Sequence, residues 1–233
     1  MRGCLSVLIL GIAFLAGAIW FGGPPLAAAV VTSTLSTSGF ASDTLDVEVT
    51  ADPPLTLAVG RAKKVAITAT GVRWNGLRLA TLALSLGSVD LIARTAATAD
   101  GHFGGVQLHG TGGQPILGDV QLTGSADAAQ TTITIDAATV STMALAAFEA
   151  SYGVKPSSAS LVAPDVVRLK VAGLTISGKL AVAPDGSIGV VANGSTIRLV
   201  DPDPSLPFHL IGLSVTSKAL ELRGTLDVGA LLR

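Results

Sequence analysis

Residues Val65–Leu86 read VAITATGVRWNGLRLATLALSL, and this stretch decides the fold. Apolar side chains recur at every second position on both sides of Asn75–Gly76, and the residues between them are mostly Thr, Arg, Ser and Ala. Such alternation is typical of strands with one apolar and one polar face, and Asn–Gly between two such runs favours a tight hairpin. We therefore predict two antiparallel strands, whose apolar face is covered by the protein itself, by a partner or by a lipid.

The alternation after Gly76 changes at one point. Apolar residues stand at Leu77 and Leu79, and then at Leu82 and Leu84. Because a slip of one residue turns every later side chain to the opposite face of a sheet, we predict a β-bulge near Ala80–Thr81.

Short strands with the same alternation recur along most of the chain. Residues 98–118 are rich in glycine and predict mainly loop. One helix is predicted over residues 141–152, where Leu145, Phe148 and Tyr152 form a stripe and Gly153 ends the helix. The further strand segments are Leu45–Val49, Leu55–Val59, Val120–Leu122, Ile133–Ile135, Leu169–Val171, Leu174–Ile176, Leu180–Val182, Ile188–Val190, Ile197–Leu199, Leu213–Val215 and Leu220–Val228.

This order of elements predicts a mainly β (α+β) chain, a long meander of antiparallel strands with very few helices. A sheet with one apolar face has to cover that face. The predicted helix is about 18 Å long, which is too short to cover so many strands. The sheet therefore closes on itself as a sandwich or barrel, curls around a helix, or leaves part of its apolar face for a ligand.

The composition limits the classes of function. The chain has 233 residues and a net charge of −1, with 49% apolar and only 13% charged residues and a mean hydropathy of +0.63. A net charge near zero gives no reason to expect a nucleic-acid partner. Cys4 is the only cysteine, which excludes an intrachain disulfide, so the fold has to be held by its own core.

The N-terminal segment is strongly apolar. Residues 5–23 read LSVLILGIAFLAGAIWFGG, and a helix of that length rises about 28 Å, close to the ~30 Å hydrocarbon core of a bilayer. Trp20 and Phe21 suit a membrane interface and favour an uncleaved anchor, whereas Arg2 and Ala27–Ala29 also fit a cleaved signal peptide. Both alternatives place the rest of the chain in the cell envelope, outside the cytoplasm, and the first anchors it to the cytoplasmic membrane.

The sequence accordingly divides into three expected parts. Residues 1–31 form the signal peptide or membrane anchor, residues 32–44 a linker or short helix, and residues 45–233 a β-rich domain. Small, uncharged residues over 24–41 and the first strand-like alternation at Leu45 set these boundaries.

No catalytic or metal-binding motif stands out in the sequence. His102, His109 and His209 do not form a zinc-ligand pattern, and neither a G-x-S-x-G nucleophile elbow nor a phosphate-binding loop is present. Asp201 and Asp203 alternate with prolines, which favours a rigid turn over an acid–base pair. We therefore expect no enzymatic activity, no metal and no cofactor.

One basic cluster follows the Leu55–Val59 segment. It contains Arg61, Lys63, Lys64, Arg73 and Arg78, five of the fifteen basic residues of the chain within eighteen positions. Beside an apolar cavity, such charges would hold an anionic phosphate head group. The alternative is a charged rim that keeps a strand edge soluble. We predict head-group contacts for Arg61, Lys63 and Lys64.

Two segments resemble the LmeA-like phospholipid-binding proteins of bacterial cell envelopes. Asp46–Leu91 contains a D-V-x-V strand, a Pro-Leu turn, Gly60–Arg61, a V-x-I-x-A-x-G-V run and a G-L-x-L-x-x-L-x-L run. Leu206–Val228 looks like the last hairpin of the family, whereas residues 95–165 match only loosely. The resemblance implies a long, strongly curved antiparallel sheet wrapped around one or two helices, similar to tubular lipid-binding folds, and it implies phospholipid binding. It supplies no catalytic residues.

Together these observations predict a membrane-associated envelope protein that holds or shuttles a phospholipid or glycolipid in an aliphatic groove. Burial of acyl chains at ~0.8 kcal/mol per methylene needs only apolar walls. The alternatives are a structural or interaction module with a protein partner and, less favoured, an enzyme acting on envelope glycolipid or glycan. The predicted lipid-binding residues are Leu55, Leu57, Val65, Ile67, Val72, Trp74, Leu77, Leu79, Leu82, Leu84, Leu86, Leu145, Phe148, Leu213, Val215, Leu220 and Leu222.

Overall fold

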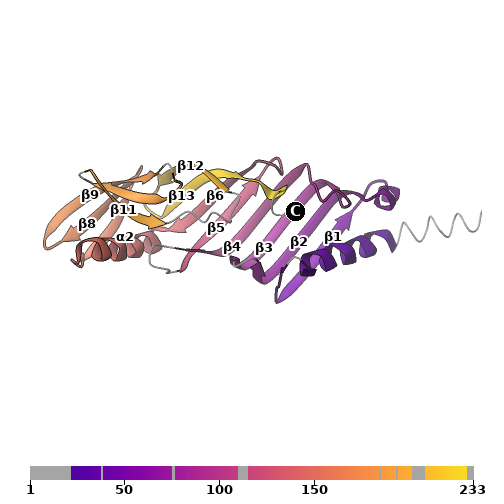
Figure 1. The fold of residues 1–233 in the computed structure, drawn as a ribbon, viewed down its shortest axis with the longest axis horizontal. Coiled ribbons are helices and arrows are strands. Elements are labelled where there is room, and N and C mark those ends of the chain that lie inside the picture. Colours follow the sequence, from indigo (N-terminus) through magenta and orange to yellow (C-terminus); the bar gives the residue numbers. More distant parts are fainter. Residues whose placement is uncertain are drawn as a thin grey trace, which may run out of the picture.

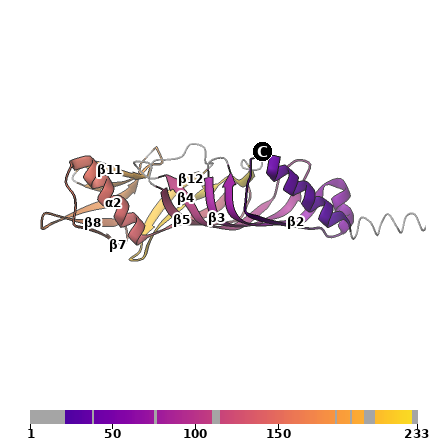
Figure 2. The same ribbon diagram turned by 90° about the horizontal axis from the view of Figure 1, so that it is seen from below.

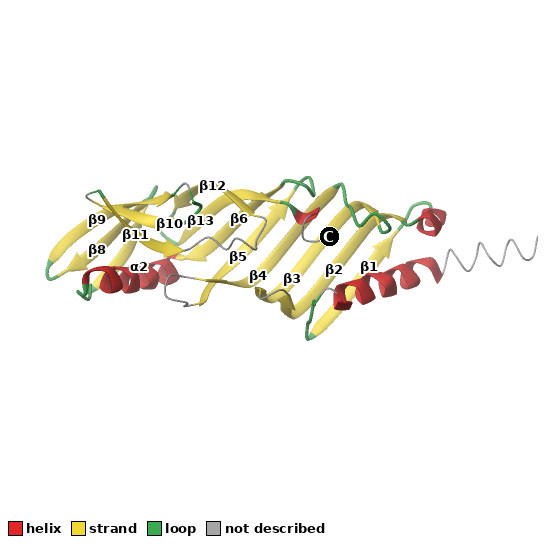
Figure 3. Cartoon of the chain, viewed as in Figure 1, coloured by secondary structure: helices red, strands yellow, loops and turns green. Residues whose placement is uncertain are grey.

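The computed structural model describes residues 22–37, 39–74, 77–109, 115–183, 185–192, 194–200 and 208–229. In this part of the chain, strands predominate and form two antiparallel sheets, and helices are few (Figure 3). The predicted mainly β class is therefore confirmed. The strands are divided between two sheets, however, where the sequence predicts one long sheet.

The larger sheet has eight strands in the order β1-β2-β3-β4-β5-β6-β13-β12, so β1 and β12 form its edges. Figure 1 shows these strands side by side along the length of an elongated molecule. Their bounds are β1 (Thr44–Thr50), β2 (Arg61–Trp74), β3 (Leu77–Asp90), β4 (Thr98–His109), β5 (Pro115–Thr123), β6 (Ala129–Asp136), β12 (Phe208–Val215) and β13 (Ala219–Leu226). Strands β2 and β3 are the predicted hairpin, whose Asn75–Gly76 turn lies outside the described residues.

The smaller sheet has five strands in the order β11-β10-β9-β8-β7. It comes from the part of the chain between β6 and β12 and forms one end of the molecule (Figure 1). Its strands are β7 (Ser158–Val162), β8 (Val166–Val171), β9 (Leu174–Val182), β10 (Ile188–Ala192) and β11 (Ser195–Val200).

Two helices lie on one side of the large sheet, near its two ends (Figure 2). One covers residues 22–37, and the other is α2 (Ala137–Tyr152). Helix α2 begins earlier than predicted, directly after β6, and ends as predicted at Gly153, which adopts a left-handed conformation (φ 67°). Its buried side chains are Val140, Ala144, Ala147 and Phe148. The predicted stripe is therefore only partly right, because Tyr152 is exposed.

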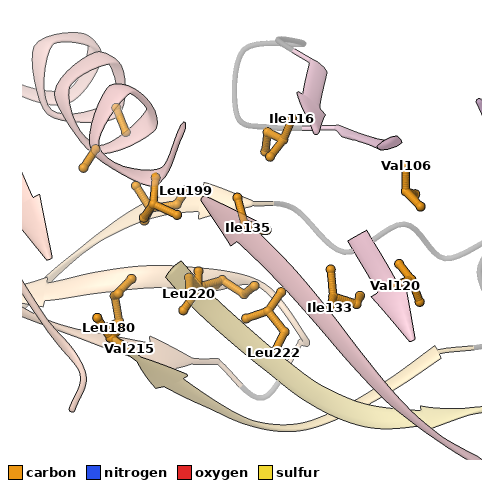
Figure 4. Close-up of a cluster of buried hydrophobic side chains, with 14 of the residues drawn as sticks. Val106, Ile116, Val120, Ile133, Ile135, Leu180, Leu199, Val215, Leu220 and Leu222 are labelled. Atoms are coloured by element: carbon orange, nitrogen blue, oxygen red, sulfur yellow. The ribbon is translucent and has the colours of Figure 1, made fainter. Parts of the chain in front are cut away.

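A single core joins the two sheets at the end of the molecule that carries α2. Leu180 and Leu199 of the small sheet lie near Val215 and Leu220 of the large sheet (Figure 4), and all four are buried. Phe148 of α2 belongs to the same cluster. Burial of these aliphatic side chains supplies the main stabilising free energy in a chain without disulfides.

Two segments form different elements from those predicted. Leu55–Val59 reads as a strand but lies in a 3-10 helix, η1 (Pro54–Val59), which begins after Pro53 and ends at Gly60 in a left-handed conformation. The glycine-rich residues 98–118 are predicted as mainly loop, but residues 98–109 form β4 and residues 115–118 form the start of β5. Their glycines fit neighbouring side chains: a Cβ on Gly104 would lie 2.5 Å from Thr81 Oγ1.

The predicted change of alternation is confirmed, but its mechanism differs. Leu79 is buried and Leu82 half-buried on one face, and Ala80 and Thr81 between them are both exposed. The same change occurs at Gly71 (φ 59°) in the facing strand, and the β2–β3 register therefore does not shift. A one-strand bulge near Ala80–Thr81 is thus wrong. The register shift occurs instead between β4 and β5, after Phe103.

The structure tests the predictions for the N-terminal segment only in part. Most of the predicted anchor, residues 5–23, lies outside the described residues. Among the described residues, no helix is long and apolar enough to cross a membrane. The helix over residues 22–37 runs across the expected boundary between residues 31 and 32, and Ala27, Ala28 and Val31 pack against the core of the large sheet.

Asp185 stabilises the turn before β10, and its effect is expected to depend on pH. Its carboxylate accepts hydrogen bonds from the Ser187 hydroxyl (2.6 Å) and the Ser187 N–H (3.0 Å), and it lies 2.9 Å from the Arg198 guanidinium. The hydrogen bonds from Ser187, helped by Arg198, lower the pKa of Asp185. A lowered folded-state pKa stabilises the protein above the unfolded-state pKa of about 4, and this contribution is lost as the pH falls through the folded-state value.

We therefore expect Asp185→Asn to lower the free energy of unfolding at pH 7 and to lower it progressively less below about pH 4. Urea unfolding of both proteins between pH 7 and pH 3 measures this difference. A difference that stays constant over that range would contradict the assignment.

Candidate lipid-binding face

The face of the large sheet that carries the helices, here called the inner face, is crossed by a continuous row of apolar residues. Each residue of the row is paired with the next across the strand ladder, so the row crosses all eight strands without interruption. Side chains at paired positions lie on the same face. From β1 to β12 the row is Leu45, Ala69, Leu82, Phe103, Val120, Ile133, Leu222 and Leu213.

A second row runs parallel to the first, two residues along each strand except β12, where the register shift between Leu210 and Gly212 makes the distance three residues. Its side chains are smaller than those of the first row at three positions, because it contains two glycines and a threonine. The Phe208 ring lies over Gly224, where a Cβ would come within 2.7 Å of the ring. Leu84 and Phe103 similarly lean over Gly101. From β1 to β12 this row is Val47, Ile67, Leu84, Gly101, Leu122, Thr131, Gly224 and Leu210.

The helix over residues 22–37 covers one end of the inner face, and α2, which packs mainly on β7 and β11 of the small sheet, meets the other end at β6 and β13, so neither helix covers the middle (Figure 2). The buried residues form two apolar clusters, one under the helix over residues 22–37 and one under α2. Five half-buried residues pack against both clusters and thus lie between them. We call these residues the central strip: Leu35, Leu45, Leu82, Phe103 and Phe208.

The predicted lipid-binding residues fall into three groups. Leu55 is exposed on η1. Half-buried are Leu57, Trp74, Leu77, Leu82, Leu84, Leu145 and Leu213. Buried are Val65, Ile67, Val72, Leu79, Leu86, Phe148, Val215, Leu220 and Leu222. The structure brings most of the predicted residues of β2, β3, β12 and β13 to the inner face. It separates Leu145 and Phe148, which lie on α2, from Leu57, which lies at the opposite end.

Several residues of the two rows are not predicted as lipid-binding from the sequence. Leu45, Val47, Phe103 and Phe208 lie beside predicted residues on the inner face. Leu45 and Val47 stand in β1, whose alternation predicts a strand but not its place on the inner face. Phe103 and Phe208 stand in glycine-containing strands, whose own alternation is weak. The pairing of Phe103 with Leu82 joins residues from different hairpins, and no local pattern in the sequence indicates it.

The three predicted head-group residues lie at the η1 end of β2. All three are exposed, and Lys63 Nζ is 3.6 Å from a carboxylate oxygen of Asp52. Arg61 and Lys64 each precede a buried, inward-pointing residue, Ala62 and Val65, so alternation directs both basic side chains to the outer face. Their contact with a head group therefore stays a prediction, and it requires that head group to lie at the end of the sheet.

One polar atom on the inner side lacks a partner. Trp74 Nε1 is buried and has no hydrogen-bond acceptor among the described residues. The indole packs edge-on against Phe40, with ring centroids 6.3 Å apart. A buried donor without an acceptor is unfavourable, so a ligand oxygen that reaches Trp74 would be bound favourably.

A shallow hollow of about 300 Å³ lies over β1, β2 and β3. Half of the residues that line it are threonines, and Leu82 is the one predicted lipid-binding residue among them. Ligand pockets span about 300–1,000 Å³, so this hollow is small for a phospholipid with two acyl chains. Within the described residues, no group of three or more His, Cys, Asp or Glu side chains is placed to hold a metal ion.

The comparison with protein families gives one match. A family model described as LmeA-like phospholipid-binding matches residues 21–225, which include the helix over residues 22–37 and nearly all of both sheets. No curated protein and no solved structure matches the chain.

Proposed function

Because the chain belongs to the LmeA-like phospholipid-binding family, we propose that it holds or shuttles a phospholipid or glycolipid on the inner face of the large sheet. The observation that supports this site best is the central strip. Leu82 and Phe103 lie in the middle of an apolar row, yet they remain half-buried, because neither helix covers them. An acyl chain placed along the row would complete the burial of these side chains.

The row is more than long enough to hold an acyl chain. Eight strands give seven spacings of about 4.8 Å, so the row is about 34 Å long. Two opposing leaflets share a hydrocarbon core of about 30 Å, and one acyl chain therefore spans about 15 Å. The proposed complex is thus a tubular lipid-binding arrangement in which acyl chains lie on the middle of the inner face, in the space between the two helices.

We also propose that the N-terminal segment is retained as a membrane anchor. Ala27 and Ala28 lie in the region of the small-residue cleavage signal, and both pack against the core of the large sheet. Cleavage there would remove the start of a packed helix. Retention would place the domain outside the cytoplasm, attached to the cytoplasmic membrane by residues 5–23.

Native mass spectrometry of the full chain tests both proposals. The protein would be produced in a bacterium, extracted in mild detergent and released from detergent in the spectrometer. We expect a phospholipid or glycolipid mass added to the intact chain. A chain that lacks residues 1–31 would contradict the anchor, and a chain that carries no lipid and takes up none from vesicles would contradict lipid binding.

A second candidate function is a non-enzymatic interaction module. It is favoured by the tight packing of much of the inner face, where Val65, Ile67 and Leu220 are at most 3% exposed. If the inner face serves only as the hydrophobic core, the protein partner of such a module binds to another surface. The absence of bound lipid in the experiment above, together with a specific protein cross-link in cells, would favour this candidate.

A further inference from the structure

One end of the molecule carries exposed apolar side chains. Leu55 and Val59 of η1 are 54% and 61% exposed, and Ile92, in the turn after β3, is 78% exposed. Ile92 lies next to the end of η1, since a Cβ on Gly60 would be 2.6 Å from Ile92 Cγ1, and Leu55 and Val59 both belong to η1. We call Leu55, Val59 and Ile92 the docking tip. Large apolar side chains grouped in this way on a surface are typical of an interaction site.

The helix over residues 22–37 starts beside the docking tip. A Cβ on Gly23 would lie 3.4 Å from Leu57 Cδ1 of η1, and Figure 1 shows η1 and the start of this helix at the same end of the molecule. The sequence that leads into the helix, residues 5–21, has no charged residue. The chain therefore reaches the docking tip directly from its most apolar segment.

The charges around the docking tip are mainly positive. Residues 51–64 and 87–97 contain Arg61, Lys63, Lys64 and Arg94 and the carboxylates Asp52 and Asp90, which gives a net charge of +2. Asp52 pairs with Lys63, and Asp90 accepts hydrogen bonds from the N–H groups of residues 92 and 93. Among the described residues, Arg61, Lys64 and Arg94 have no carboxylate within 4 Å.

We propose that the docking tip binds the surface of an anionic lipid bilayer. Leu55, Val59 and Ile92 enter the interface between head groups and acyl chains, and Arg61, Lys64 and Arg94 contact lipid phosphates. Apolar side chains next to unpaired cations are the combination that interfacial membrane binding requires. The docking does not depend on lipid binding by the inner face. It orients the large sheet with its β1 end toward the membrane.

Site-specific fluorescence of the full chain tests this orientation. Replacement of the single cysteine, Cys4→Ser, gives a background in which Ile92→Cys is labelled with a polarity-sensitive fluorophore. Leu174→Cys is the matched control, because Leu174 is 71% exposed and lies in the small sheet, at the opposite end of the molecule. Both proteins are reconstituted into vesicles that contain anionic phospholipid and nitroxide-labelled lipid as a quencher.

We expect at least fivefold stronger quenching of the label at position 92 than at position 174. Arg61→Gln, Lys64→Gln and Arg94→Gln together, or vesicles of zwitterionic lipid, are expected to halve the quenching at position 92. Equal quenching at the two positions would overturn the proposal. A blue shift at position 92 that disappears when the protein is diluted within the vesicles would indicate a second copy of the chain and would also overturn it. Lipid bound to the same labelled proteins, measured by native mass spectrometry, reports the inner face separately.

Discussion

Replacement of Leu82 with Asp is expected to lower the fraction of the protein that carries a phospholipid at least tenfold. Leu82 lies in the central strip, paired with Ala69 on one side and Phe103 on the other. A carboxylate at this position would be placed against acyl chains with no cation to pair with it. Burial of an unpaired charge costs several kcal/mol, and about 1.4 kcal/mol already corresponds to a tenfold change in affinity.

The next residue in β3 provides a matched control. Ala83 is exposed and pairs with Thr68 and His102 on the outer face. Ala83→Asp therefore adds the same charge one position along the chain, and we expect it to leave the lipid-bound fraction unchanged. Circular dichroism and thermal unfolding establish whether Leu82→Asp is folded. If it is not, Leu82→Trp fills the central strip with an apolar ring and is expected to reduce lipid binding without a buried charge. A folded variant with wild-type lipid occupancy would exclude the inner face.

The hairpin of β2 and β3 shows what the sequence predicts well. Both strands are long, and alternation in each identifies the inward side chains without knowledge of any other strand. Val65, Ile67 and Leu86 are accordingly buried on the inner face. The change of face between Leu79 and Leu82 is also visible in the sequence of β3, and the matching change at Gly71 is visible in the sequence of β2.

The candidate site itself is not visible in the sequence, because it depends on pairing between distant strands. The row through Leu82 includes Leu45 and Leu222, which come from opposite ends of the domain. The sequence assigns the packed helix over residues 22–37 in part to the anchor and in part to a segment predicted as a linker or short helix. Its inward residues, Ala27, Ala28 and Val31, are small, and their burial becomes evident only when the sheet beneath them is present.

The glycines of β4 lead to a wrong prediction of loop, again because strand pairing is not visible in the sequence. Glycine usually weakens a strand, so the abundance of glycine between residues 98 and 118 predicts loop. In the folded sheet, Gly101, Gly104 and Gly105 accommodate side chains of β3. Gly105 is the most constrained of them, because it combines a left-handed conformation with a close neighbour on β3.

Gly105→Ala is therefore expected to lower the free energy of unfolding by about 2–5 kcal/mol, the sum of two effects. Gly105 has φ 61°, and a left-handed conformation costs an alanine about 1–2 kcal/mol. The new Cβ would also lie 2.8 Å from the Cβ of Ala80, and overlap of this kind in a packed sheet costs about 1–3 kcal/mol. Chemical denaturation of the purified variant measures the sum.

Two further variants separate the backbone effect from the overlap. Gly153 has φ 67°, and a Cβ added to it would have no heavy atom within 4 Å, so Gly153→Ala should show only the backbone effect of about 1–2 kcal/mol. Ala80→Gly removes the atom that Gly105→Ala would meet. In the double variant we expect about 1–3 kcal/mol of the overlap to be recovered, as a positive coupling in a double-mutant cycle. If Gly105→Ala is no more destabilising than Gly153→Ala, β4 does not pack against Ala80 as the structure places it, and the ladder that aligns Phe103 with Leu82 would have a different register.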